Sequence, residues 1–262
     1  MNIYHASLGQ PLPPLAPEDE VKPYAHYYYL GPVKPQSPMY EKTRPGNPMG
    51  PQYALLPEQV EKIFQGNVSD TDLGYCITPE GYGYASVVTQ MPKVTLPMVL
   101  WFDGKWNLED PLRYSIWFPG SHIIQDWDWI VEDMGFGLCE IFAKNFLGPD
   151  SWLVDPSLLK PESGCRMVGG SNALLRPLNG DKLVPPFNVV VMHYVRAKGE
   201  GLEWHSRFWI GVEVIGGKAV NRLRPGQVVP LEYARGFCEH CAYEMATRAE
   251  RLPEWYALFK DE

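Results

Sequence analysis

The sequence lacks the features that would place the protein in a membrane, on nucleic acid or in an oxidising compartment. None of its 262 residues lie in a run approaching the roughly 18 apolar residues that a transmembrane helix needs. Basic runs are missing and the net charge is -8, which argues against nucleic-acid binding. Cysteines are few and odd in number, five in all, and no secretory signal is visible. We therefore expect a cytoplasmic protein with reduced thiols that acts on neither nucleic acid nor membranes.

Aromatic residues and prolines are what the chain has in quantity. The 9 Trp and 15 Tyr favour an interior or pocket lined by aromatic side chains. Prolines are concentrated near the start, which predicts an extended, irregular segment to about residue 50. Tyr27, Tyr28, Tyr29 and Leu30 within it could pack on the main body. We divide the chain into a Pro-rich N-terminal arm or small subdomain at 1–70 and a catalytic domain at 71–262.

The patterns after residue 74 predict antiparallel strands followed by one long helix. The expected strands are 83–89, 114–118, 138–146, 188–196 and 203–214, and a short helix is expected at 56–64. The last two strands form a hairpin through 197–201. The long helix begins after Pro230 and runs to about Leu252, where Pro253 ends or kinks it. This order favours an α+β fold in which a curved sheet grips the helix and leaves a ligand cavity between them.

His240 and Glu244 lie four residues apart in this predicted helix. At that spacing an imidazole and a carboxylate project from one face on successive turns, as in helices that hold one metal ion with two side chains. Cys238 and Cys241 form a CxxC without a second pair, so we interpret them as small buried helix residues. An ordinary His/Glu pair on a helix surface is the alternative, because short motifs specify sites loosely.

His122 and Glu132 complete a set of two histidines and two carboxylates with the helix pair. Such a set suits Zn²⁺ with a bound water, and its N and O ligands also admit Mn²⁺ or Fe²⁺. Taken singly, His122 could be a loop histidine and Glu132 a solvated carboxylate. His193, in the middle of a strand, is either a core histidine or a general acid/base facing a pocket.

Several runs resemble, in the same order, the family of diacetylphloroglucinol and phloretin hydrolases. The similarity covers roughly residues 70–258. The runs are Gly74 to Tyr84, Met91 to Thr95, Trp101-Phe102, Arg113 to His122, His193 to Arg196, Ser206 to Gly211, His240 to Met245, Leu252-Pro253 and Tyr256.

The resemblance implies a fold, a reaction and a site. Enzymes of this family hydrolyse the carbon–carbon bond between an acyl group and a phloroglucinol-type ring, and their fold is a helix-grip sheet like that of START-related and Bet v-like domains. It implies a zinc site in the cavity with ligands His122, Glu132, His240 and Glu244. Tyr114 would bind a substrate hydroxyl, His193 would be catalytic or orienting, and Glu132 could take the proton of the water. A homodimer and a small acylated phenol as partner are also implied.

Some positions depart from the family pattern, and they concern the pocket more than the metal. Gln125 stands where the family tends to show Asn, His205 where it often has Arg, and Phe208 where relatives carry a pocket Tyr; Gln125 and Phe208 are our further substrate-binding candidates. Glu140 competes with Glu132 as the third ligand because the spacing from the histidine is short. Two alternatives to hydrolysis therefore stay open: dehydration, cyclisation or rearrangement of an aromatic polyketide-like substrate, and carriage of a hydrophobic ligand without catalysis.

Overall fold

The computed structural model describes residues 11–60, 62, 72–125, 129–135, 138–143, 165–177 and 187–262. Within these ranges the chain forms an eight-stranded antiparallel sheet in the order β1-β2-β8-β7-β6-β5-β4-β3. The strands are β1 Gly74–Ile77, β2 Gly83–Met91, β3 His122–Gln125, β4 Trp129–Gly135, β5 Leu138–Ala143, β6 Cys165–Pro177, β7 Phe187–Lys198 and β8 Gly201–Ile210. A separate ribbon pairs β9 Val212–Ile215 with β10 Lys218–Asn221. For most residues of β3–β6 only the backbone is described.

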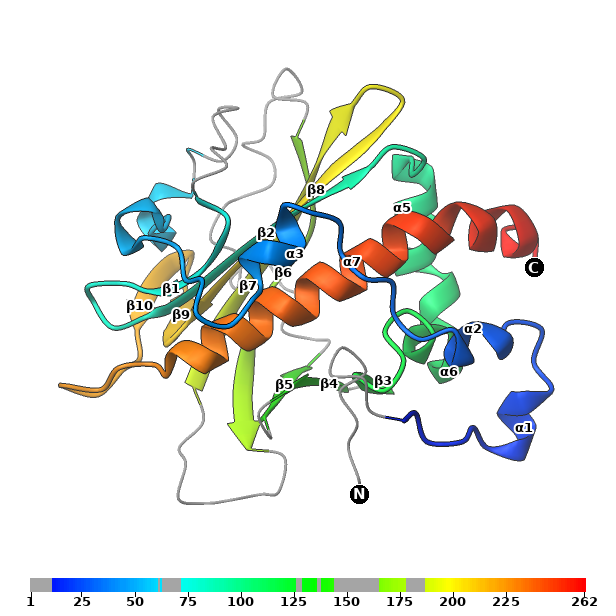
Figure 1. The fold of residues 1–262 in the computed structure, drawn as a ribbon, viewed down its shortest axis with the longest axis horizontal. Helices are drawn as coiled ribbons and strands as arrows, with labels where there is room; N and C mark the ends of the chain where they lie inside the picture. Colours follow the sequence, from blue (N-terminus) through cyan, green and yellow to red (C-terminus); the bar gives the residue numbers. More distant parts are fainter. Residues whose placement is uncertain are drawn as a thin grey trace.

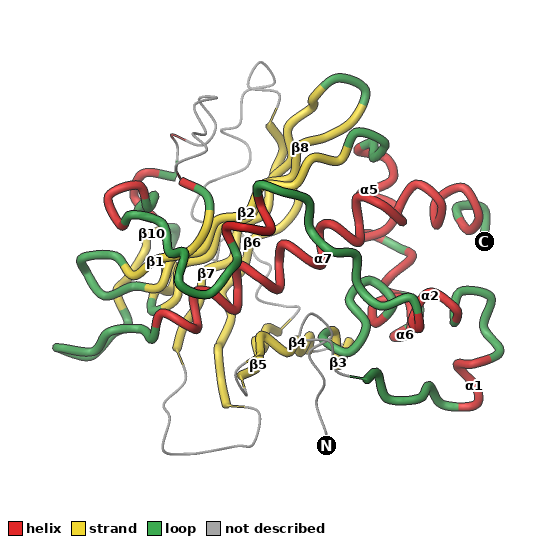
Figure 2. Tube along the Cα trace, in the orientation of Figure 1, coloured by secondary structure: helices red, strands yellow, loops and turns green. Residues whose placement is uncertain are grey.

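The helices are one long element and several short ones. They are α1 Pro17–Glu20, α2 His26–Tyr29, α3 Met39–Lys42, α5 Leu96–Gly104, α6 Pro111–Ser115 and α7 Leu231–Phe259, with 3-10 turns η2 Pro51–Tyr53, η3 Pro57–Gln59 and η5 Trp106–Leu108. Helix α7 runs across the sheet (Figure 1). It contacts β1 and β2 near one end of the strand order and β4 near the other. Strands therefore lie on both sides of α7 in the view of Figure 2. None of the described helices is long and apolar enough to cross a bilayer.

The predicted α+β class is confirmed, as are the strands at 83–89 and 188–196 and the hairpin with 203–214, which is split into β8 and β9. The strand at 138–146 is confirmed to residue 143, beyond which it lies outside the described residues. Of the helix expected at 56–64, the 3-10 turn η3 and residue 62 are helical; 61, 63 and 64 are not described. The arm predicted to be extended and irregular contains three four-residue helices, so it is not extended throughout.

The strand predicted at 114–118 is wrong, because Tyr114 lies in helix α6. Asp110 caps this helix: its carboxylate accepts a hydrogen bond from the Leu112 N–H at 2.8 Å, and Pro111 occupies the first helical position. Tyr114 and Ile116 are both buried.

Helix α7 continues through Pro253 to Phe259, so of the two alternatives at Pro253, an end or a kink, the end is wrong. A proline inside a helix costs roughly 3 kcal/mol. Packing compensates here, since Leu252, Trp255 and Phe259 on either side of it are buried in the main core. Phe237 and Met245, nearer the start of the helix, are buried too.

The N-terminal segment lies along α7. The Tyr27 hydroxyl donates to Glu254 at 2.7 Å, the Arg251 guanidinium donates to the Gly31 carbonyl at 2.7 Å, and the Val33 N–H donates to the Thr247 hydroxyl at 2.8 Å. Tyr27 and Tyr28 are buried, whereas Tyr29 is exposed. Of the four residues expected to pack on the main body, Tyr27 and Tyr28 thus do so, whereas Tyr29 and Leu30 are exposed.

Candidate metal centre

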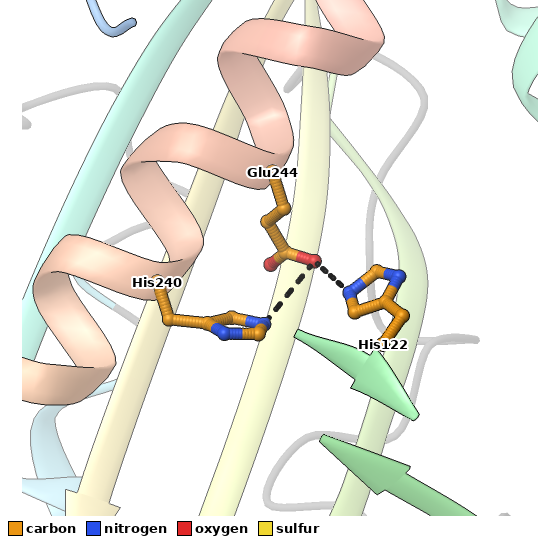
Figure 3. A group of neighbouring side chains, drawn as sticks. All are labelled: His122, His240 and Glu244. Carbon is orange, nitrogen blue, oxygen red and sulfur yellow. Dashed lines mark ion pairs between the residues drawn. The ribbon is translucent and has the colours of Figure 1, made fainter. Parts of the chain in front are cut away.

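Four buried side chains from three elements converge between α7 and the sheet. His240 and Glu244 project from α7, His122 begins β3, and Glu132 is its register partner on β4. Figure 3 shows the His122, His240 and Glu244 side chains pointing toward one another. Their ligand atoms all lie within 4.8 Å of one another, the arrangement that a shared metal ion requires.

The separations of the donor atoms fit a single small cation. The Nε2 atom of His122 lies 3.4 Å from Glu244 and 3.7 Å from Glu132, and that of His240 lies 3.2 Å from Glu132 and 3.9 Å from Glu244. Two ligand atoms each about 2.1 Å from a tetrahedral Zn²⁺ would be about 3.4 Å apart. The four side chains are therefore already close to the spacing that such a site needs.

The orientation of His122 also fits metal binding. Its Nδ1–H donates to the Tyr114 carbonyl at 3.1 Å, so Nε2 carries the free lone pair of the neutral ring. That atom is buried and makes no hydrogen bond with any part of the chain that the structure describes. A ligating histidine with its other nitrogen bonded to a carbonyl is the usual arrangement in metal sites. Ser121 holds His240 in a similar way, with its hydroxyl 3.0 Å from Nδ1.

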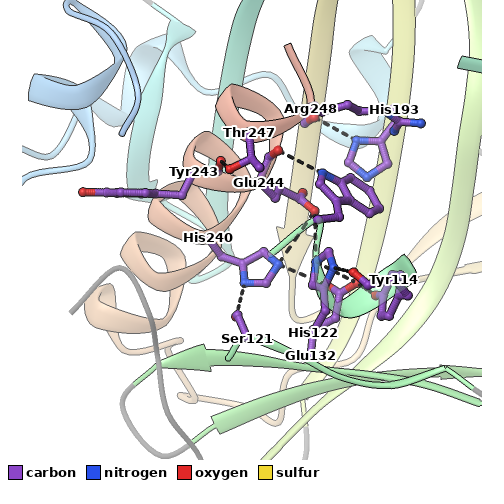
Figure 4. Close-up of polar contacts among 12 residues, drawn as sticks. Tyr114, Ser121, His122, Glu132, His193, His240, Tyr243, Glu244, Thr247 and Arg248 are labelled. Atoms are coloured by element: carbon purple, nitrogen blue, oxygen red, sulfur yellow. Dashed lines mark hydrogen bonds and ion pairs between the residues drawn. The ribbon is translucent and has the colours of Figure 1, made fainter. Parts of the chain in front are cut away.

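Tyr114 contacts two members of the cluster. Its hydroxyl donates to the Glu132 carboxylate, and its ring stacks on that of His122 with centroids 4.2 Å apart (Figure 4). The sequence pointed to Tyr114 as a group that binds a substrate hydroxyl. In the structure that hydroxyl is hydrogen-bonded to Glu132, so Tyr114 positions the Glu132 carboxylate, a candidate metal ligand.

Burial and charge shape the ionisation of the cluster. Burial raises the pKa of Glu244, whereas Glu132 has a lowered pKa because the charges and hydrogen bonds of His122, His240 and Tyr114 outweigh the effect of its burial. Burial likewise lowers the pKa of His122 and favours its neutral, ligating form. A cation among these groups would favour both carboxylates in their charged form.

His193 lies outside the cluster but within its electrostatic field. It projects from β7, and Figure 4 shows it beside Arg248, at the end of the group away from Ser121. Burial and the Arg248 charge lower its pKa to about 4, although the Glu132 carboxylate acts in the opposite direction. His193 is therefore neutral at physiological pH, and its Nδ1 lies 2.8 Å from the Ser206 hydroxyl.

Phe208, Gln125 and Glu140 are the remaining candidates from the sequence, and of these the structure describes the side chain of Phe208. Phe208 is buried on β8, with its ring centroid 5.8 Å from that of His193 and 5.2 Å from that of Phe237. The backbones of Gln125 and Glu140 lie in β3 and β5, but both side chains fall outside the described residues. Of the two competing carboxylates, Glu132 is thus the one observed beside the imidazoles.

Sequence reasoning missed several residues that support the site. Ser121 contacts His240, Ser206 contacts His193, and the Trp117 indole donates to the Glu244 carbonyl at 2.9 Å. Arg248 follows Glu244 by one helical turn, and its position in the series His240, Glu244, Arg248 was the one available signal for it.

The chain was also compared with known protein families. Residues 55–257 match the family described as DAPG hydrolase PhiG domain, which is more than half of the chain. The chain belongs to the DAPG hydrolase family. Membership implies a hydrolase and confirms the resemblance drawn from the sequence motifs. A search among curated proteins found no match.

Proposed function

We propose that this protein is a metal-dependent hydrolase that cleaves the carbon–carbon bond between an acyl group and a polyhydroxylated aromatic ring. The observation that carries the proposal is the buried His122, Glu132, His240 and Glu244 cluster in a chain of the DAPG hydrolase family. The ligand set favours Zn²⁺, and Mn²⁺ or Fe²⁺ would fit the same N and O donors. When bound, the ion would polarise the acyl carbonyl or lower the pKa of water.

The chain's own residues then have distinct roles. Glu132, held by the Tyr114 hydroxyl, accepts the proton of the attacking water. His193 hydrogen-bonds an oxygen of the substrate, and Phe208, whose ring contacts that of His193, packs against the substrate ring. Gln125 is proposed as a further contact to the substrate. Water supplies the hydroxyl of the released carboxylic acid and the hydrogen that replaces the acyl group on the ring, so the products are an acid and a deacylated phenol.

The finer description of the fold is proposed with the function. Because α7 contacts strands near both ends of the sheet order, we assign the fold to the helix-grip class. We retain the division into an arm at 1–70 and a catalytic domain at 71–262. A cytoplasmic homodimer acting on a small acylated phenol in polyketide-type secondary metabolism completes the proposal.

Metal analysis combined with product analysis tests this function. Mass spectrometry of the purified protein should find about one zinc per chain in the wild type and in His26→Ala, which alters an exposed histidine, but none in His240→Ala. A panel of acylated phloroglucinols and resorcinols should yield acid and deacylated phenol with the first two proteins only. Full turnover by metal-free His240→Ala would contradict the proposal, and a product of unchanged mass would replace hydrolysis with rearrangement.

A further inference from the structure

His193 and Ser206 face each other across the β7–β8 pair. The two residues are direct register partners, so their side chains lie on the same face of the sheet. The Ser206 hydroxyl lies 2.8 Å from Nδ1 of His193, a good hydrogen-bonding distance. With Nδ1 taken by the serine, Nε2 is the nitrogen left to contact a bound molecule.

Trp204 orients the Ser206 hydroxyl and uses one of the two acceptor positions on its oxygen. Its indole N–H can only donate, and it donates to the Ser206 oxygen at 3.1 Å. The serine has one proton left to give. Among the described residues, the Cys241 sulfur also lies within hydrogen-bonding reach of Ser206, but it is a weaker acceptor than the His193 nitrogen. The stronger acceptor favours donation from the Ser206 hydroxyl to Nδ1 of His193.

We infer that Ser206, itself oriented by Trp204, is a positioning residue that fixes His193 as the Nε2–H tautomer and so presents a neutral hydrogen-bond donor to the substrate. The chain of donors runs from the Trp204 indole through the Ser206 hydroxyl to the imidazole. His193 is then a donor, and in this tautomer it offers no free nitrogen with which to act as a base.

The surroundings of His193 support a neutral donor. Arg248 is buried nearby with its guanidinium carbon 4.5 Å from the Trp204 ring centroid, and its charge opposes protonation of the imidazole. A neutral N–H aimed at an oxygen where negative charge develops stabilises the transition state without a proton transfer. The acceptor would be a phenolic or acyl oxygen, and this part of the inference rests on the proposed function.

The tautomer can be measured directly in the full-length, metal-loaded protein. Long-range ¹H–¹⁵N spectra of ¹⁵N-histidine-labelled protein distinguish a protonated ring nitrogen from an unprotonated one, and His193→Gln assigns the signal. We expect Nε2–H in the wild type and in Ser206→Thr, which keeps the hydroxyl, and a mixture of tautomers in Ser206→Ala. A wild-type signal from Nδ1–H would overturn the inference even if no variant folded.

Kinetics supplies the second readout. For Ser206→Ala we expect kcat to fall about 10-fold to 100-fold, as for loss of residues that orient a catalytic group, with KM changed less and zinc content unchanged. Ser86→Ala is the matched control, since Ser86 is equally buried but pairs with Arg207, on the opposite face from Ser206.

The two proposals fail in different ways. If acylphenols are hydrolysed but Ser206→Ala keeps the wild-type tautomer and rate, the positioning role is wrong and the hydrolase stands. If no acylphenol is hydrolysed but the tautomer changes as expected, the hydrogen-bond chain stands and the proposed function is wrong.

Discussion

The Trp117 indole donates a hydrogen bond to the backbone carbonyl of Glu244, 2.9 Å away. Trp117 lies in the turn after α6, five residues before His122, so this bond joins the helix that carries two cluster residues to the segment that leads into the third. Both residues are buried. The relative position of α7 and β3 at the cluster is therefore fixed by a direct bond as well as by packing.

Replacing Trp117 with Phe should weaken metal binding while leaving the fold intact. Phe keeps an aromatic ring for the contacts with Phe102 and His122 but loses the N–H donor. Loss of partners that orient metal ligands typically costs 10-fold to 100-fold in affinity. Competition with a zinc chelator measures the change, and an affinity equal to that of the wild type would show that the bond does not hold Glu244 in place.

Tyr114→Phe should retain zinc when the metal is saturating, yet bind it about tenfold less tightly and turn over more slowly. The variant removes the hydrogen bond to Glu132 and preserves the ring that stacks on His122. Tyr243→Phe is the control, because the Tyr243 side chain points away from the cluster (Figure 4). If the two variants lose zinc to a chelator equally readily and turn over at equal rates, Tyr114 does not contribute to the metal site.

Chelation should lower the stability of the protein if the cluster holds a metal. At a free zinc concentration 100 times the Kd, the bound metal contributes about 2.7 kcal/mol to the free energy of unfolding. Thermal unfolding with and without chelator measures the loss. The melting temperatures of the wild type and His26→Ala should fall, whereas that of His240→Ala should not respond; a response in His240→Ala would locate the metal elsewhere.

His193 should stay neutral in the folded protein until the pH approaches about 4. In the unfolded chain it takes up a proton near pH 6.5, so between these values the unfolded state binds more protons. Its contribution to stability is therefore present above about pH 6.5 and is lost as the pH falls toward 4, by up to about 3 kcal/mol.

Denaturant unfolding of the wild type and His193→Gln across this range isolates that contribution. The stability of the wild type should decline more steeply than that of the variant as the pH falls. Parallel pH profiles would mean that His193 titrates at an ordinary value.

Arg248→Met should destabilise the fold by about 3 kcal/mol. The guanidinium pairs with Asp103 at 2.5 Å and lies over the rings of Phe102, Trp117 and Trp204 at 4.5–4.9 Å, and losing it leaves Asp103 without its partner. Arg222→Met breaks a more exposed ion pair with Glu213 and should cost less than about 1 kcal/mol. Chemical denaturation of both variants measures the difference, and similar losses would show that the burial of Arg248 adds nothing.

The helical half of the site could be predicted from the sequence, because the i, i+4 spacing of His240 and Glu244 is a local property of a helix. The approach of His122 and Glu132 could not be, since it depends on the β3–β4 register and on how the sheet meets α7. For these two residues, the resemblance to the family motifs was the basis of the prediction.

Two errors and one omission have identifiable physical causes. The Tyr114 strand was predicted from apolar composition, although Asp110-Pro111 is a helix start signal that outweighs it. An end of α7 at Pro253 was one of two alternatives expected from proline chemistry, which burial of Trp255 and Phe259 overrides. Ser206 was missed, yet a hairpin closing at Gly199-Glu200 already pairs it with His193 by register.

The cluster combines residues from early and late parts of the chain. His122 and Glu132 are translated more than a hundred residues before His240 and Glu244, and every described strand precedes α7. While α7 has not yet emerged from the ribosome, the nascent chain has only two of the four candidate ligands, which are too few for a closed metal site. Metal uptake is expected to follow docking of α7. Bound metal would therefore distinguish completely folded chains from incomplete ones, which would lack the stabilisation that the metal provides.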